Sequence, residues 1–279
     1  MSESSKRQLY YTKIWREEAE PDNPFAAKAC YCHGYDVYGS ILQKASWFEY
    51  LYLLFKGERP SDAQARLLER LAIALANPGP REVSVRAAMN GGVGGSRNAA
   101  SLMAALAVGA GQYGGGHEVY LLVNAWQALG ADPQAWKQWL SQPNEGYRED
   151  IWRPIEHAPG FDPNGESCPT PVKQTLDLLA AISPGSALTW LRDQRESLEV
   201  HIGYPLAMSG VAAAAFRDLG MDGHQASMLY LMLRLPGAAV HALEQRELGW
   251  KTFPFYGNNI ELVKDPGPKE MPDISRFEL

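Results

Sequence analysis

The segment that decides the fold runs from Trp47 to Gly57 and reads WFEYLYLLFKG. Its large apolar side chains recur at the three- and four-residue spacing of an α-helix, and the glycine marks the end of the pattern. Ser61 then offers an N-cap, and the leucines that follow, as far as Leu75, continue as a second amphipathic helix. Two neighbouring helices of this kind predict a helical core.

The same spacing extends over most of the chain. Further helices are predicted for residues 98–108, 118–129, 133–140, 171–182, 186–198, 205–219, 223–235 and 238–248. The best strand signal, at residues 82–86, is short. Residues 141–170 shift to Pro, Gly, Asn and charge, which predicts a long irregular segment, and residues 250–279 are proline-rich and predicted to be extended. We therefore predict an all-α protein.

Composition and charge exclude several classes of protein. A chain of 279 residues can bury a sizeable core, and its net charge of -6, without clustered Lys and Arg, argues against nucleic-acid binding. Cys30, Cys32 and Cys168 are too few for a disulfide framework, and no second pair stands at zinc spacing, so no metal is expected. With no apolar signal segment and no apolar run judged long enough for a bilayer, a cytoplasmic protein without a membrane partner is expected.

A glycine-rich stretch, GAGQYGGGHEVY at residues 109–120, needs a separate interpretation. Gly109, Gly111 and Gly114 spell the G-x-G-x-x-G string of dinucleotide-binding proteins, which requires a preceding β-strand. Residues 101–108 are mostly Leu, Met and Ala and favour a helix instead. We therefore expect no nucleotide cofactor here and interpret the stretch as a substrate loop at the start of a helix.

Several segments, in order along the chain, resemble the citrate synthase superfamily. HGYDV (33–37) followed by residues 47–60 is similar to the family's RGYDI … FEEVAYLLLxGELP signature. GGGHEV (114–119) is similar to its HGGANEAV loop, and PGF (159–161) to the start of its PGFGH loop. Near the end of the chain, GAAVHALEQ (237–245) is similar to AGWxAHxxEQ and FPFYG (253–257) to RPxxxYxG. The short length and GVGGSRN (92–98) are more similar to the citryl-CoA lyase type, which resembles the C-terminal module of ATP-citrate lyase.

The resemblance implies both an architecture and a reaction. It implies an all-α homodimer in which a large domain (1–118 and 195–279) and a small domain (119–194) close over a cleft. It also implies the joining of a CoA thioester to an oxo-acid, or the reverse cleavage of a citryl-CoA-like thioester, with these small molecules as partners. Such chemistry needs a base for the proton alpha to the thioester and a donor for the enolate oxygen.

The chain departs from the family at the catalytic positions. Tyr113 stands where the loop histidine is expected, Met89 where an earlier histidine is expected, and Leu206 where the late aspartate is expected. Asp162 follows the PGF segment in place of Gly-His, and Phe253 replaces an arginine. We therefore expect citrate and oxaloacetate to be poor substrates. Two interpretations stay open: an enzyme with relocated catalytic groups, or a non-catalytic CoA-binding or scaffold paralogue.

The candidate site residues come from three segments. The catalytic candidates are Tyr113, His117, His157 and Asp162; the candidates for binding substrate or CoA are Gly114, Gly115, Gly116, Glu118, Ser96, Arg97 and Asn98. The tyrosine can donate a hydrogen bond, but its ordinary pKa makes it a poor base. Glu118 could instead complement the dipole of its own helix. The last three candidates begin a helix, which favours either an anion site or a plain N-cap.

Overall fold

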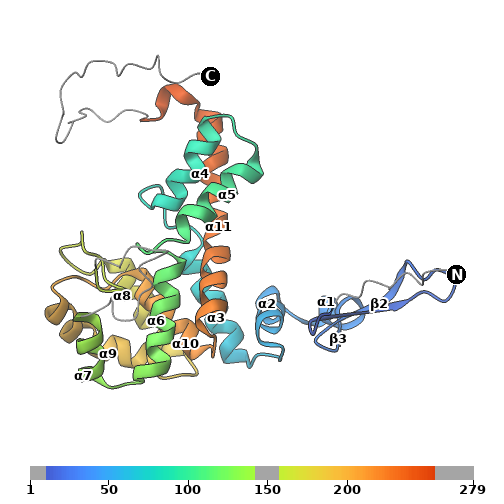
Figure 1. Cartoon of the computed structure of the whole chain (residues 1–279), viewed down its shortest axis with the longest axis horizontal. Coiled ribbons are helices and arrows are strands. Elements are labelled where there is room, and N and C mark those ends of the chain that lie inside the picture. Colours follow the sequence, from blue (N-terminus) through green and yellow to red (C-terminus); the bar gives the residue numbers. More distant parts are fainter. Residues whose placement is uncertain (1–10, 142–156, 255–279) are drawn as a thin grey trace, which may run out of the picture.

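The computed structural model describes residues 11–141 and 157–254, and these form a helical body with one small sheet (Figure 1). The sheet comes first: β1 (Trp15–Ala19), β2 (Ala27–Cys32) and β3 (Tyr35–Asp36) pair antiparallel in that order. It projects from the body beyond the one-turn π-helix (Val37–Ile41) and α1 (Leu42–Lys44). The sequence did not predict these strands, because β1 is largely exposed and only Cys30 and Cys32 are buried in β2, so no extended alternation of apolar residues marks them.

The two helices that open the body form as predicted. α2 (Trp47–Lys56) begins with a capping box, in which Ser46 accepts from the backbone of Glu49 at 3.2 Å and the glutamate carboxylate accepts from the serine backbone at 2.7 Å. A second capping box, at Ser61, begins α3 (Asp62–Leu75). Each box satisfies two backbone donors that an N-terminus leaves free, so both helix starts are encoded locally.

Five helices make up most of the body, and the last of them is the best buried. They are α6 (Gly116–Leu129), α7 (Pro133–Ser141), α8 (Thr170–Ile182), α9 (Ala187–Ile202) and α10 (Met208–Asp218). The residues of α10 from Ser209 to Phe216 are all buried. Three tryptophans, Trp126, Trp136 and Trp190, join α6, α7 and α9 with ring centroids 4.6–5.7 Å apart. The main core therefore lies where α6 to α10 meet α3 and the first half of α11.

A separate three-helix bundle rises from this body (Figure 1). It contains α4 (Val83–Val93), α5 (Asn98–Gly109) and the second half of α11 (Gly223–Leu248), and its small core is made of alanines. A Cβ atom on Gly92 would lie 2.1 Å from the Ala242 carbonyl oxygen, so α4 can approach α11 this closely only with a glycine at that position.

Two predicted elements were wrong. Residues 82–86 begin α4 and form no strand, because the Glu82 carboxylate caps the helix by accepting from the backbone of Ser84 (2.9 Å) and Val85 (3.2 Å). Residues 223–248 form one helix where two were predicted. Pro236 lies inside it, and the next residue, Gly237, donates its N–H to the Ala76 carbonyl at 2.7 Å, so α3 supports the helix at the break.

The length of α11 also corrects the expectation that no apolar run is long enough to cross a bilayer. Within the described ranges it is long and apolar enough to cross a membrane by length and composition. However, it packs against α3, α4, α5 and α6, as a core helix of a globular protein does. This packing accounts for the apolar residues on the buried side of the helix.

Candidate active site

The loop between α5 and α6 requires its glycines. Gly114 has a left-handed φ of +60°, and a Cβ atom on Gly115 would lie 2.3 Å from the Gly111 carbonyl oxygen. The segment that precedes this loop is α5, a helix, so the G-x-G-x-x-G string lacks the strand that a dinucleotide site needs. The loop instead presents Tyr113 at the side of the body, where it is 46% exposed.

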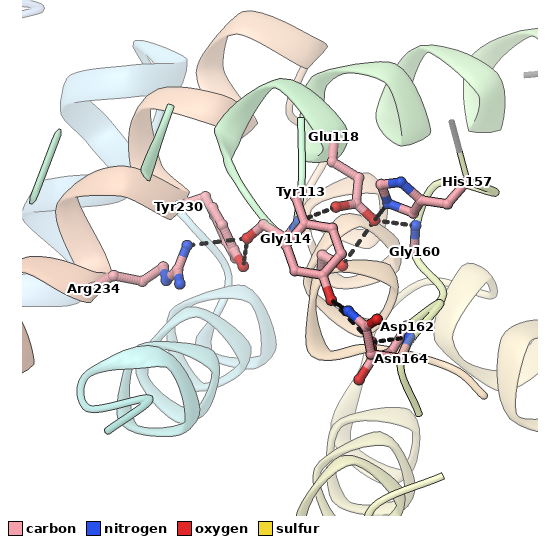
Figure 2. A network of polar contacts seen from close by, with 10 residues as sticks. Tyr113, Gly114, Glu118, His157, Gly160, Asp162, Asn164, Tyr230 and Arg234 are labelled. Carbon is pink, nitrogen blue, oxygen red and sulfur yellow. Dashed lines mark hydrogen bonds and ion pairs between the residues drawn. The ribbon is translucent and has the colours of Figure 1, made fainter. Parts of the chain in front are cut away.

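Glu118 ties this loop to two other segments. Its side chain is only 1% exposed, and its carboxylate accepts hydrogen bonds from the backbone N–H of Gly114 and of Gly160 and from the Ser209 hydroxyl at 3.2 Å (Figure 2). These donors come from the glycine loop, from the segment after residue 156 and from the first turn of α10. Glu118 therefore holds together the three backbone segments that form the site.

The Tyr113 hydroxyl reaches the second of these segments. It lies 3.2 Å from Asp162 Oδ1 and 2.5 Å from Asn164 Nδ2 (Figure 2). Burial raises the pKa of Tyr113, the Asn164 hydrogen bond lowers it, and the Asp162 carboxylate raises it again. The net direction is upward, so the phenol stays protonated near neutral pH and can act as a hydrogen-bond donor.

His157 lies beside the tyrosine ring. Its imidazole meets the ring edge-on, with centroids 5.4 Å apart, and its side chain is 10% exposed. Nε2 is 3.8 Å from Glu118 Oε1, beyond hydrogen-bond distance, and has no hydrogen-bond partner among the described residues. A buried ring nitrogen without a partner is exceptional in a native protein and marks this histidine as a candidate functional group.

An arginine and a tyrosine of α11 hold the carbonyl of Gly114, the residue whose N–H is bound by Glu118. Tyr230 and Arg234 both donate to the Gly114 carbonyl, at 2.9 and 3.1 Å, and the guanidinium also pairs with Glu82 at 2.7 Å. Burial raises the pKa of Tyr230 to about 12, with the arginine acting in the opposite direction. The charge of Arg234 is thus used within the protein and positions the glycine loop.

Two cavities adjoin at this loop and share part of their walls. The larger, of about 470 Å³, extends from Tyr113 and Gly114 past Arg81 and Arg234; the smaller, of about 210 Å³, contains Glu118, His157 and Asp162. The shared wall consists of Tyr113, Gly114, Ala207, Met208 and Ser209. The arrangement can therefore accommodate two groups on either side of one tyrosine hydroxyl.

The structure brings together some candidate residues and separates others. Tyr113, His157 and Asp162 meet at the smaller cavity, with Glu118 behind them. His117 does not line either cavity; its ring stacks on Tyr120 with centroids 5.9 Å apart, and burial lowers its pKa. The reason is helical geometry, since consecutive residues of α6 point about 100° apart.

Ser96, Arg97 and Asn98 lie at the opposite end of α5 from the glycine loop. With 1.5 Å of rise per residue, the length of α5 places them roughly 16 Å or more from Gly109. There Arg246 donates to Asn98 Oδ1 at 3.2 Å and to the Ser96 carbonyl at 2.9 Å. Within one chain these residues do not reach the Tyr113 site.

Three residues of the site escaped the sequence analysis. Asn164 carries no signal in a single sequence because it lies in a polar, turn-forming segment, and Ser209 carries none because it is a lone serine in an apolar, alanine-rich helix. Arg234 did carry a signal: a charged residue inside the apolar run LMLRLPG predicts a buried partner of opposite charge, which is Glu82.

Comparison with known proteins establishes the fold. No family model matches the sequence, and no curated protein does. Among solved structures, the chain resembles citryl-CoA lyase from Hydrogenobacter thermophilus, with a TM-score of 0.71 and 19% identity over 95% of this chain and 98% of that one. It also resembles ATP citrate lyase from Methanothrix soehngenii, solved with citrate and coenzyme A, with a TM-score of 0.70 and 16% identity over 98% of this chain and 44% of that one.

Citrate synthase from Thermoplasma acidophilum, solved with carboxymethyl coenzyme A and oxaloacetate, is more distant. Its TM-score is 0.60, with 15% identity over 84% of this chain and 61% of that one. The prediction of an all-α, citrate synthase-like fold is confirmed, and the likeness extends over nearly the full length of citryl-CoA lyase.

Proposed function

We propose that this chain, which has the citrate synthase-like fold, is an enzyme that makes or breaks the carbon–carbon bond alpha to a CoA thioester. One observation carries the proposal: the Tyr113 hydroxyl meets the Asp162 carboxylate at the wall of two adjoining cavities. The similar folds of citryl-CoA lyase, ATP citrate lyase and citrate synthase support this class of reaction.

Each group at the junction has a role in the proposed reaction. Asp162 is the base that removes the proton alpha to the thioester, and Tyr113 donates a hydrogen bond to the oxygen that becomes the enolate oxygen. His157 lines the smaller cavity together with Asp162 and Tyr113, so we assign its catalytic role to the thioester side of the junction. This chemistry needs neither a metal nor a nucleotide cofactor.

The larger cavity suits an acceptor with fewer carboxylates than citrate. Its wall carries two cations, Arg81 and Arg234, and the second is already paired with Glu82. Much of the remaining wall is apolar, including Leu75 and Met208. Because a buried carboxylate without a cation is costly, we propose an oxo-acid acceptor other than oxaloacetate, and poor activity with citrate itself.

We further propose a cytoplasmic homodimer that forms through the three-helix bundle. Four apolar residues of α5 and α11 are 44–67% exposed there: Met103, Val108, Val240 and Leu243. Apolar side chains left exposed on both helices support a subunit interface at the bundle. Light scattering of Leu243→Glu is expected to show a monomer. Val200→Glu, on an 84% exposed residue of α9, is the matched control and is expected to leave the dimer intact.

Domain closure and CoA binding complete the proposal. Residues 119–194 would form a small domain that closes against the remainder, residues 1–118 and 195–279. Ser96, Arg97 and Asn98 would bind a CoA phosphate from the bundle rather than from the cleft of their own chain. For the proposed CoA-phosphate site, we expect calorimetry to show that Arg97→Ala binds CoA more weakly.

The test of the reaction is exchange of the alpha proton. The chain is incubated in heavy water with acetyl-CoA and a panel of acyl-CoAs, and proton NMR follows the loss of the alpha signal. Tyr113→Phe and Asp162→Asn are expected to lose exchange while the melting shift caused by CoA persists. Tyr38→Phe changes a 62% exposed tyrosine outside both cavities and is expected to exchange normally.

The same assay separates the alternative function. A non-catalytic paralogue would show a melting shift with CoA but no exchange with any thioester. The absence of both exchange and a melting shift would remove the proposed enzyme and the proposed CoA-binding protein together.

A further inference from the structure

Asn164 contacts both members of the proposed catalytic pair without lining either cavity. Its backbone N–H donates to Asp162 Oδ1 at 3.0 Å, and its side-chain amide lies 2.5 Å from the Tyr113 oxygen. The cavity walls contain Tyr113 and Asp162 but not Asn164. One residue therefore sets the position of the two groups that face the substrate.

The hydrogen-bond directions follow from what each group can donate. An ionised carboxylate only accepts, so across the 3.2 Å contact the Tyr113 hydroxyl must donate its hydrogen to Asp162. A hydroxyl has a single hydrogen, so its second partner, Asn164, must donate to the phenol oxygen. In this state the tyrosine has no hydrogen left for a substrate oxygen.

Uptake of a proton by Asp162 reverses this arrangement. The C–H bond alpha to the thioester breaks, its proton passes to Asp162, and its electron pair becomes the carbon–carbon double bond of the enolate. The negative charge then resides on the enolate oxygen. The protonated carboxyl is a weaker acceptor than the negatively charged enolate oxygen, so the tyrosine hydrogen turns to the enolate oxygen while Asn164 still holds the phenol. The alpha carbon and the oxygen are two bonds apart, so neighbouring groups can contact both.

We propose that Asn164 is a positioning residue that keeps the Tyr113 oxygen fixed, so that its hydrogen bonds Asp162 before proton removal and the enolate oxygen after it. This inference rests on the proposed function, and it assigns a role to a residue outside the cavity walls. It also explains how a tyrosine that is bonded to the base in the resting site can still stabilise the enolate.

The experiment uses Asn164→Leu in the full chain. Because Asn164 is exposed, the variant is expected to fold with unchanged melting. The rate of alpha-proton exchange at saturating thioester is expected to fall roughly tenfold with KM within about twofold, as for one lost hydrogen bond. Asn23→Leu, which loses one side-chain bond to the Phe25 backbone in the distant hairpin, is the control and is expected to exchange normally.

A second readout needs no substrate. With 3-fluorotyrosine at position 113, fluorine NMR follows the titration of that phenol. Asn164→Leu is expected to raise its pKa, since a donor to the phenolate is lost, and Asp162→Asn to lower it, since a negative charge is removed. An unchanged titration or an unchanged exchange rate in Asn164→Leu would overturn the inference. A wild-type chain without exchange would instead overturn the proposed function, whatever the titration shows.

Discussion

Replacement of Glu118 by glutamine tests whether the hydrogen bonds that its carboxylate accepts hold the site together. The carboxylate is 1% exposed and accepts from the backbones of Gly114 and Gly160 and from Ser209. A glutamine amide offers one oxygen. If that oxygen still accepts the hydrogen bonds from the Gly160 N–H and the Ser209 hydroxyl, the NH₂ group must face the Gly114 N–H. Two hydrogen-bond donors then oppose each other.

The magnitude follows from the number of donors left without an acceptor. One unsatisfied buried donor costs about 1–3 kcal/mol, so Glu118→Gln is expected to lose this much free energy of unfolding. Glu118→Leu leaves all three donors without an acceptor and is expected to lose more free energy of unfolding. In a chain of roughly this size each kcal/mol lowers Tm by about 2–4 °C.

Urea denaturation followed by circular dichroism measures the loss, with Glu196→Gln as control because Glu196 is 84% exposed. The expected order of stability is control, then Glu118→Gln, then Glu118→Leu, with unchanged m values. A glutamine variant within about 0.5 kcal/mol of the control would refute the reasoning, because surface changes have effects of that size.

Four further predictions follow from single residues. In urea denaturation, Gly115→Ala is expected to lower the free energy of unfolding more than Gly114→Ala does. A Cβ atom at position 115 would lie 2.3 Å from the Gly111 carbonyl oxygen, whereas position 114 has open space and only a left-handed φ. Equal losses of free energy in the two variants would contradict this. Burial lowers the pKa of His117, so folding favours its neutral form, and stability is lost as the pH falls from the ordinary pKa of 6.5 toward the lowered pKa of the folded state. Between pH 7 and pH 5 the Tm of His117→Gln should therefore fall less than that of the wild-type chain. Equal falls in Tm would exclude the effect. Burial raises the pKa of Cys168 to about 11, so this thiol should resist a thiol-specific reagent at pH 8 until urea is added, and rapid labelling of the folded chain would disprove its burial. Gly92→Ala should separate α4 from α11 and lower Tm by several degrees, and an unchanged Tm would contradict the 2.1 Å approach to the Ala242 carbonyl.

Local signals were sufficient for much of the fold. α2 and α3 could be predicted because their capping boxes and leucine spacing lie within one turn of sequence. Prediction failed at residues 82–86 because their alternating pattern favours a strand, whereas Glu82 caps a helix there; its pairing with Arg234 is a distant contact. It failed at Pro236 because distant groups decide the structure. Pro236 lies inside one helix because α3 and the bundle pack beside it.

The candidate site was predictable only in part, for the same reason. Resemblance to a family placed Tyr113 and Asp162 on loops expected to face one cleft, and the structure joins them at 3.2 Å. It could not show that His117 turns toward Tyr120, because that depends on the exact start of α6. Asn164 becomes meaningful only when its contacts with Tyr113 and Asp162 are seen.

The central claim is that Asp162 removes the proton alpha to a CoA thioester with Tyr113 beside it. The most direct test is the exchange rate of Asp162→Asn in heavy water, on the thioester that the wild-type chain exchanges fastest. Loss of the general base predicts a fall of about 10²-fold or more, with the CoA-induced melting shift retained. Exchange at the wild-type rate in this variant would contradict the claim.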